Sequence, residues 1–581
     1  MKLINYFWGL IKSFLFFIIK EFFSFFIKSA LFLVLLSGVF TFLLNRETNK
    51  NKIIKNNFYV KIDLSQKFKE KSNTKTFFDE KALNFYSLLA NIEDITLNTE
   101  VKGLILNLDD ISLNYSQVEE LSQYLLKLKE YRNIDIISYM EEVDKKNFYL
   151  ASFTNKIFMP KTNSTVVNIS PYFRESFYKK DFLDKLGVKF NIVNTGNYKS
   201  YGEDLASSKM SKEAREDSTR ILKENYENFL DKVSNNLRYD RNKMDNLIKN
   251  GDLVAASSKD LYEQKLISGY MYWSEIVNMI GEDHIVDIND YALNYFTFDQ
   301  YNSKNKIYIM ALEGSISDED ILNNTFINPS NVINSLNKLE KDDSVKGLVI
   351  RVDSPGGSAL ASDKISNRLK EFKKKKPVYI SMGGVAASGG YYIASNANKI
   401  FASESTITGS IGVVSVIPNF SELLNKTGIN NEKISEGEFA DLYSSDEMTK
   451  EKYNKILKSN LKVYDDFLNE VSNGRKINRA KLEKMAEGRI WTGREAVELG
   501  LVDEIGGLSD TVYSMIEDLE LGDDYNVIFM EDKMDVKNLY KKYSKFISSS
   551  KIEKLSLMKN SIFDENLYNK PILYMPYEIF E

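Results

Sequence analysis

The feature that most constrains the fold of this chain is an internal duplication. Three segments of the first half recur in the same order in the second half, 238 to 244 residues later. The recurring pairs are residues 101–109 and 345–353, 149–158 and 392–401, and 228–235 and 466–473. Three collinear matches at nearly one spacing predict two homologous domains, at about residues 57–300 and 301–522. Residues 523–581 match no earlier segment and form a predicted C-terminal extension.

Each half alternates short apolar runs with charged stretches of helical character, such as residues 116–132 and 362–374. The apolar runs are rich in β-branched residues and hardly alternate with polar ones, which is typical of parallel strands covered on both faces. These runs are residues 104–108, 134–139, 348–352 and 378–382. The pattern predicts an α/β fold for both halves.

Two glycine-rich elements occur in the second half only. Residues 353–357 (DSPGG) stand where the first half has residues 109–113 (DDISL), and residues 382–390 (MGGVAASGG) stand where it has residues 140–147 (MEEVDKKN). Because the first half lacks both elements, neither is needed merely to build the fold. We therefore expect them to form a functional site.

Ser388 is the candidate nucleophile of that site. It follows an apolar run and opens the helical stretch 389–398. Consecutive glycines let backbone N–H groups face a cleft, because no Cβ stands in the way. The amide of Gly389 and one from the Gly356-Gly357 turn could form an oxyanion hole for acyl transfer. The alternative is that these turns pack tightly or bind phosphate.

Few residue types are left that could activate Ser388. The chain contains no cysteine, and its one histidine, His284, lies among polar residues as a surface histidine would. Lysine, aspartate and glutamate remain. The absence of cysteine and the single histidine also exclude cysteine-based and multi-histidine metal sites.

Lys199 is the lysine that the comparison of the two halves singles out. Residues 196–200 (GNYKS) align with residues 437–441 (GEFAD), so Ala440 takes the place of the lysine in the second half. A lysine acts as a base only when it is neutral, which requires burial that lowers its pKa. Without further information, the alternative of a solvated surface charge stays open.

The N-terminal residues 1–56 form a predicted membrane anchor. Residues 22–44 are mostly apolar and carry no charge except Lys28, which can reach the interface, and 23 residues are enough to span a bilayer as a helix. Residues 3–27 are predicted to form an interfacial helix before this span. A cleaved signal peptide is the alternative, but the apolar region is long and no A-x-A site ends it. Basic residues on both sides leave the orientation undecided.

The motifs together resemble the signal peptide peptidase A (protease IV) family of Ser–Lys serine peptidases, in its long tandem-domain form. The resemblance covers roughly residues 5–520, and no motif position departs from the family pattern. The motifs are residues 198–200 (YKS), 353–357 (DSPGG), 382–391 (MGGVAASGGY) and 408–412 (TGSIG).

The resemblance implies a catalytic Ser–Lys dyad. Ser388 would be the nucleophile, Lys199 the proton acceptor and then donor, and Ser410 would orient the lysine by a hydrogen bond. The oxyanion hole would be drawn from Gly356, Gly357 and Gly389. No metal, nucleotide or other cofactor is expected.

The resemblance also implies the architecture and location of the protein. Two tandem Clp-protease/crotonase-like domains, of the ββα superhelix type, would follow the transmembrane helix. The protein would be a homotetramer with a ring-like arrangement, a single-pass protein of the bacterial cytoplasmic membrane with its catalytic body on the outer, periplasmic side. Its substrates would be released signal peptides and, as a second class, misfolded envelope polypeptides.

Two other functions are alternatives to this one. A crotonase-like acyl-CoA enzyme would share the fold but needs no nucleophilic serine, and a serine-reactive acylating inhibitor separates the two. An inactive membrane scaffold would fail a peptide-cleavage assay. A nucleic-acid-binding protein is disfavoured, since 77 basic and 82 acidic residues are interspersed and the net charge is −5.

Overall fold

The computed structural model of the chain describes residues 57–71, 83–171, 173–294, 303–318, 326–444, 447–530 and 572–574. The predicted interfacial helix and the predicted span at residues 22–44 lie outside these residues. Within the described part of the chain, no helix combines the length and the apolarity needed to cross a membrane.

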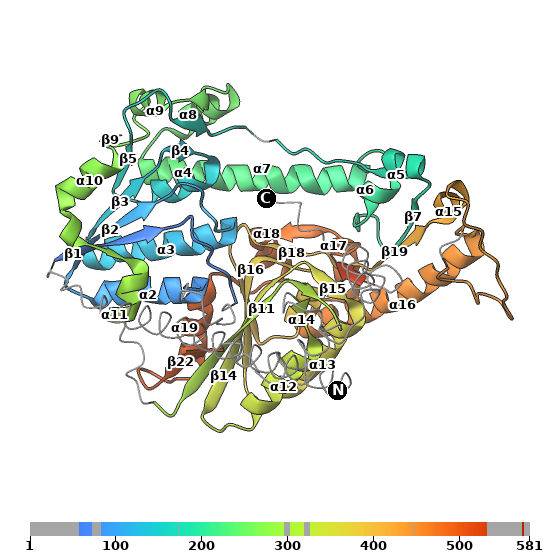
Figure 1. Ribbon diagram of the computed structural model, residues 1–581. Coiled ribbons are helices and arrows are strands. Elements are labelled where there is room, and N and C mark those ends of the chain that lie inside the picture. The colour runs from blue at the N-terminus through green and yellow to red at the C-terminus, as the bar shows by residue number, and fades with distance from the viewer. Residues whose placement is uncertain are drawn as a thin grey trace, which may run out of the picture. The chain divides into compact units, whose positions relative to one another are not determined.

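The first repeat is built on a parallel sheet with the strand order β10–β1–β2–β3–β5–β9 (Figure 1). Its strands are β1 (Phe58–Asp63), β2 (Val101–Asn107), β3 (Asp135–Tyr139), β5 (Lys156–Met159), β9 (Gly269–Tyr270) and β10 (Ile285–Asp287). The connecting helices include α2 (Phe85–Leu97), α3 (Tyr115–Arg132), α4 (Lys145–Ser152), α7 (Lys212–Leu237), α8 (Arg241–Lys249), α9 (Ser258–Glu263), α10 (Trp273–Ile280) and α11 (Ile288–Asn294).

The second repeat has a sheet with the order β20–β18–β16–β14–β11–β22, and β17 pairs with both β16 and β21. Its strands are β11 (Lys306–Glu313), β14 (Val345–Ser354), β16 (Val378–Ala387), β17 (Lys399–Ala402), β18 (Ile407–Gly409), β20 (Ile490–Thr492), β21 (Glu504–Ile505) and β22 (Asn526–Phe529). Its helices are α12 (Pro329–Glu340), α13 (Ala359–Lys373), α14 (Gly389–Ala394), α15 (Ser421–Lys426), α16 (Lys450–Arg475), α17 (Arg479–Met485), α18 (Gly493–Leu499) and α19 (Leu508–Asp518).

The two sheets repeat one another strand by strand. In the order β10, β1, β2, β3, β5 and β9, the strands of the first sheet correspond to β22, β11, β14, β16, β17 and β21 of the second. Both sheets shift register at the same place, after Phe58 in β1 and after Lys306 in β11. The predicted α/β fold and its duplication are confirmed. Because β22 pairs with β11, the second sheet extends beyond residue 522.

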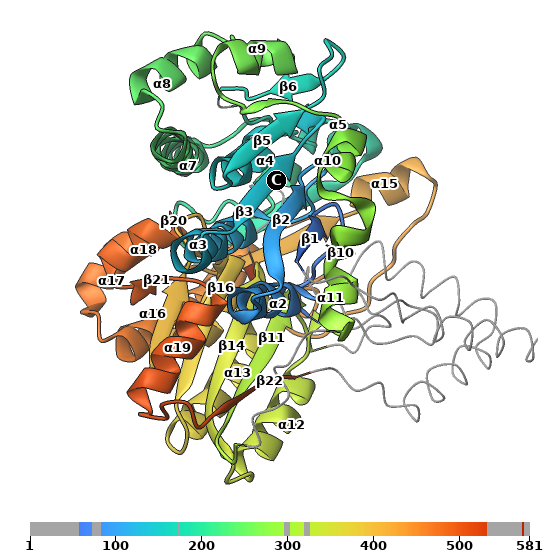
Figure 2. The same ribbon diagram turned by 90° about the vertical axis from the view of Figure 1, so that its left-hand side faces the viewer.

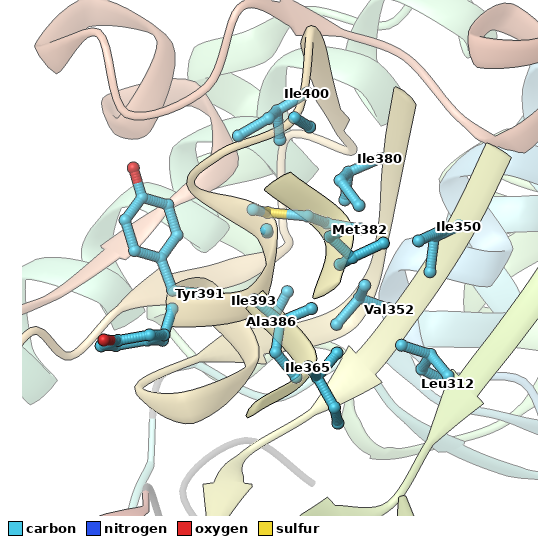
Figure 3. Packing of buried hydrophobic residues seen from close by; sticks show 14 of the residues in the cluster. Leu312, Ile350, Val352, Ile365, Ile380, Met382, Ala386, Tyr391, Ile393 and Ile400 are labelled. Carbon is cyan, nitrogen blue, oxygen red and sulfur yellow. The ribbon is translucent and has the colours of Figure 1, made fainter. Parts of the chain in front are cut away.

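Helices cover both faces of the second sheet, which explains its nearly continuous apolar strands. Leu348 and Ile350 of β14 belong to a core cluster that includes Ile365 and Leu369 of α13. Val349, between them in β14, packs into a separate cluster with residues of α19. Figure 3 shows the first cluster, in which side chains of β14, β16 and α14 interdigitate. This core fixes the carboxyl-terminal halves of β14 and β16, in which both glycine-rich motifs begin.

A buried ion cluster also joins the two repeats beside these strands. Arg351 of β14 is completely buried and lies 2.9 Å from a carboxylate oxygen of Glu70 and 2.5 Å from one of Glu120, both in the first repeat. The same guanidinium donates to the Ser381 hydroxyl of β16. Glu120 belongs to α3, which Figures 1 and 2 place between the two sheets.

A third sheet contains strands of both repeats in the order β13–β12–β15–β23–β19–β7. Its strands are β7 (Lys189–Asn194), β12 (Ser315–Ile316), β13 (Phe326–Ile327), β15 (Gly356–Ser358), β19 (Val414–Asn419) and β23 (Ile572–Tyr574). β7 of the first repeat pairs antiparallel with the whole of β19 in the second. The short helices α5 (Lys180–Leu186) and α6 (Glu203–Ala206) flank β7. A small sheet of the first repeat contains β4 (Glu142–Val143), β6 (Val166–Asn168) and β8 (Val254–Ala256).

Candidate active site

Ser388 occupies a sharp turn between a strand and a helix. β16 ends at Ala387, and α14 begins at Gly389. The Ser388 backbone has φ +54° and ψ −114°, a region that a residue with a Cβ rarely adopts. The turn is fixed on both sides, because the Ser388 amide donates to the Gly409 carbonyl (2.9 Å) and the Tyr392 amide donates to the Ser388 carbonyl (2.8 Å). Strained strand-to-helix turns of this kind present a nucleophilic hydroxyl in α/β-hydrolases.

The corresponding helix of the first repeat, α4, has an ordinary start. Asp144 precedes α4 as Ser388 precedes α14, with φ −118° and ψ −176°. Its carboxylate caps the helix by accepting from the Asn147 amide at 2.8 Å. The Ser388 side chain makes no capping bond to α14. Its hydroxyl is therefore available for a different partner.

That partner is Lys199, which the loop after β7 brings in from the first repeat. Lys199 Nζ lies 2.8 Å from Ser388 Oγ. It also lies 2.9 Å from the carbonyl oxygen and 2.9 Å from the hydroxyl oxygen of Ser410. Lys199 is 2% exposed and both serines are buried. The structure thus brings together the serine of one repeat and the lysine of the other.

Burial lowers the pKa of Lys199 well below that of a free lysine, because desolvation disfavours the charged ammonium. The hydrogen-bonding partners fit a neutral amine. The Ser410 carbonyl can only accept, so one N–H points to it, and the second N–H can point to the Ser410 hydroxyl. The lone pair of the nitrogen then faces the hydroxyl of Ser388. This is the arrangement that a general base requires.

The backbone around Lys199 is held by the second repeat. Thr195 and Val413 exchange hydrogen bonds, continuing the β7–β19 pairing toward the lysine. The amide of Tyr198 donates to the Glu487 carbonyl. Gly488, with φ +85°, lies against the backbone of the lysine so closely that a Cβ there would be 2.5 Å from the backbone nitrogen of Lys199. Sequence reasoning missed Thr195 and Gly488, since backbone contacts leave no motif.

The two glycine-rich motifs contact each other beside Ser388. A Cβ on Gly389 would lie 3.2 Å from the Cα of Gly356, and a Cβ on Gly390 would lie 2.7 Å from the Ser354 carbonyl oxygen. The Gly356 amide donates to the Ser354 hydroxyl at 3.1 Å, so it already has a partner. Of the three glycines expected to form an oxyanion hole, Gly357 and Gly389 then remain as the candidate donors.

Asp353, the first residue of the DSPGG motif, supports the strand that carries Ser388. It is buried, and its carboxylate accepts a 2.9 Å hydrogen bond from the Val385 amide of β16. Burial raises the pKa of Asp353 to about 7. His284 lies elsewhere, with Nδ1 3.1 Å from the backbone carbonyl oxygen of Asn57.

Comparison with known proteins finds matches over both repeats. The model of peptidase family S49 matches residues 129–284 and 370–522, and the model of Clp protease matches residues 300–407. "Protease 4" of Haemophilus influenzae is 31% identical over 456 residues, which are 74% of this chain and 72% of that protein. "Serine protease SPPA, chloroplastic" of Arabidopsis thaliana is 32% identical over 448 residues, 74% of this chain and 65% of that protein. "Putative signal peptide peptidase SppA" of Enterococcus faecium is 36% identical over 232 residues, 39% of this chain and 67% of that protein.

Proposed function

The chain belongs to peptidase family S49, and on this premise we propose that it is a serine peptidase in which Ser388 attacks the peptide bond and Lys199 is the general base. The serine peptidase activity follows from the family. The assignment of the two residues rests on one observation, the 2.8 Å between Lys199 Nζ and Ser388 Oγ in a buried site.

The proposed reaction starts when the neutral amine of Lys199 accepts the hydroxyl proton of Ser388. The Ser388 oxygen attacks the carbonyl carbon of the substrate, and the amides of Gly357 and Gly389 stabilise the resulting oxyanion. Lys199 then gives its proton to the leaving amine, and water hydrolyses the acyl-enzyme. Ser410 holds the amine in place through its carbonyl and hydroxyl oxygens.

Two substitutions and one control test this assignment. Ser388→Ala and Lys199→Met should each lower peptidase activity at least about 1,000-fold, since each removes a member of the dyad. Ser415→Ala should keep the activity, because this buried serine is bonded to Asn460 instead. A fluorophosphonate probe should label Ser388 in the wild type and label neither dyad variant. Normal turnover by Lys199→Met would refute the dyad.

We propose released signal peptides, and misfolded envelope polypeptides as a second class, as the substrates. The support is the name of the relative from Enterococcus faecium and the apolar side chain of Ile316, which comes within 3.2 Å of a Cβ on Gly389. The test compares kcat/KM for a synthetic signal peptide and for a polar peptide of equal length. Equal values would contradict the preference.

We propose that residues 22–44 anchor the protein in the bacterial cytoplasmic membrane with the catalytic body outside. The support is the apolar sequence of this segment. The protein should stay in the membrane pellet after carbonate extraction, and protease added to spheroplasts should digest its body. A body that is digested only after lysis would reverse the orientation.

We also propose a homo-oligomer, a tetramer, that forms through the strand pairing that joins the repeats. The counterpart of β7 in the second repeat is residues 429–436. Gly428 and Gly437 bracket this segment, as Gly187 and Gly196 bracket β7, and all four glycines have positive φ. An equivalent pairing in a neighbouring subunit would give residues 429–436 the role that β7 has within the chain.

The counterpart of β19 in the first repeat is residues 173–178, which follow β6 as β19 follows β18. Within the described residues, neither this segment nor residues 429–436 is part of a sheet. Phe173 and Phe177 are 79% and 71% exposed, and Ile434 is fully exposed. Apolar side chains exposed in this way are typical of contact surfaces. Pairing between subunits would bury them and, repeated, close a ring.

A further inference from the structure

A strand from the C-terminal extension lies between the two walls of the candidate active site. β23 pairs antiparallel with β15, and the register places Tyr574 opposite Gly356, Leu573 opposite Gly357 and Ile572 opposite Ser358. On its other side β23 pairs antiparallel with β19, with Ile572 opposite Val414.

The two strands that flank β23, β15 and β19, lie next to the residues of the proposed reaction. β15 contains Gly357, a proposed oxyanion donor, and Gly356, which lies against Gly389 next to the nucleophile. β19 begins four residues after Ser410 and pairs with β7, which leads to Lys199. A peptide between β15 and β19 would therefore pass the dyad with hydrogen-bonding partners along both of its edges. Strand addition of this kind is a common way to bind extended peptides.

We propose that β23 occupies the substrate channel of its own chain and competes there with peptide substrates. This inference rests on the proposed function. Without β23, β15 and β19 are facing edges whose backbone groups lack a shared neighbour in the sheet. The space between β15 and β19 therefore accommodates one extended segment, either β23 or a substrate, and not both.

The sequence limits how strongly β23 can bind. Pro571 and Pro576 flank the strand, and proline has no N–H to donate, so the paired segment contains at most residues 572–575. So short a strand gains few hydrogen bonds, each of modest net value. Tethering compensates, because it presents the strand at a fixed effective concentration. The arrangement thus acts as a reversible competitor that a tight substrate can displace.

Disulfide trapping tests the placement without relying on activity. The chain has no cysteine, so introduced pairs react cleanly. In a Ser388→Ala background, Ser358→Cys with Ile572→Cys should cross-link within the chain on mild oxidation, since directly opposed antiparallel residues lie within disulfide range. The control, Ser358→Cys with Tyr574→Cys, is two residues out of register and should cross-link much less. Equal yields in the two variants, or cross-linked dimers in place of monomers, would overturn the inference.

Kinetics test the competition. Leu573→Pro removes one N–H from the strand, whereas Leu573→Ala keeps it. The proline variant should lower the apparent KM for a peptide about five-fold at unchanged kcat, because a hydrogen bond of the competing segment is lost. The alanine variant should resemble the wild type. An unchanged KM in the proline variant would overturn the competition, whereas activity retained by Ser388→Ala would overturn only the proposed function.

Discussion

At the scale of the residue, Lys199 is a buried group whose lowered pKa opposes folding. Between its lowered pKa and the ordinary value of 10.5, the folded protein binds fewer protons than the unfolded chain. The free energy of unfolding should therefore rise with pH in this range, because folding must remove the proton from Lys199 and this costs less as the pH approaches the ordinary pKa. This cost is fully present below the lowered pKa.

Lys199→Met should accordingly be inactive yet more stable than the wild type at pH 7. Removing the buried amine, which must give up its proton on folding, should raise the melting temperature by about 2–4 °C for each kcal/mol relieved. The difference should shrink as the pH approaches 10.5. Thermal scans at pH 7 and pH 10 measure it, and Lys374→Met, at a mostly exposed lysine, should show no such trend. A lower melting temperature of Lys199→Met at pH 7 would contradict the argument.

Ser388 stores backbone strain that a glycine would relieve. Its φ of +54° is costly for any residue with a Cβ but not for glycine. Ser388→Gly should thus be more stable than Ser388→Ala by about 1 kcal/mol, measured by urea unfolding of the two inactive variants. At Ser395, where φ is −57°, the order should reverse, since glycine is the poorer helical residue. The same order at both positions would remove the evidence for strain.

Ser388 and Lys199 could be singled out from the sequence because the two repeats differ there. Their contact could not be derived from spacing, since it depends on the pairing of β7 with β19 across the repeats. The roles of these residues stay predictions, although the structure brings them within hydrogen-bonding distance. No sequence pattern identifies Gly488, because what matters is its close contact with the backbone of Lys199.

At the scale of the element, the loop that carries Lys199 depends on close packing against the second repeat. Gly488→Ala would place a Cβ 2.5 Å from the backbone nitrogen of Lys199, so the loop must move. A shift of about 1 Å at a catalytic group costs on the order of 100-fold in rate. We therefore expect kcat to fall by about this factor with a small change in KM. Gly428→Ala is the matched control, since its φ is also positive but nothing lies within 4 Å. Equal losses in both variants would assign the effect to backbone strain.

Helices and strands were predicted best where the sequence pattern within the element itself determines them. The expected helix at 116–132 is observed at 115–132, and the expected run at 134–139 is a strand at 135–139. β14 and β16 extend beyond the predicted runs, to Ser354 and Ala387, through glycine-rich sequence with poor strand propensity. Their pairing with neighbouring strands stabilises these extensions, and no local pattern reports it. The predicted fold was thus right in class and short at the ends that carry the site.

At the scale of the whole molecule, the proposed dyad gives one complete site per chain, divided between the two repeats. The second repeat supplies Ser388, and its own lysine position is Ala440 in an exposed turn. The first repeat supplies Lys199, and its helix that corresponds to α14 begins with the ordinary cap Asp144. In the proposed ring, the strand pairing within a chain would therefore position the dyad, and the strand pairing between chains would only hold the subunits together. The membrane anchor lies outside the described residues and stays a prediction.

The proposed contact between chains predicts a specific charge pair. Transferring the β7–β19 register to residues 429–436 and 173–178 places Glu175 of one subunit opposite Lys433 of the next. Opposite charges across paired strands stabilise them and like charges destabilise them, each by about 0.2–1 kcal/mol. Glu175→Lys should thus weaken assembly several-fold, and adding Lys433→Glu should restore it, as measured by sedimentation equilibrium. Because Glu175 and Lys433 are not part of the dyad, the peptidase activity of each variant serves as the control for correct folding. Failure of the double variant to recover would mean that the subunits meet through other surfaces.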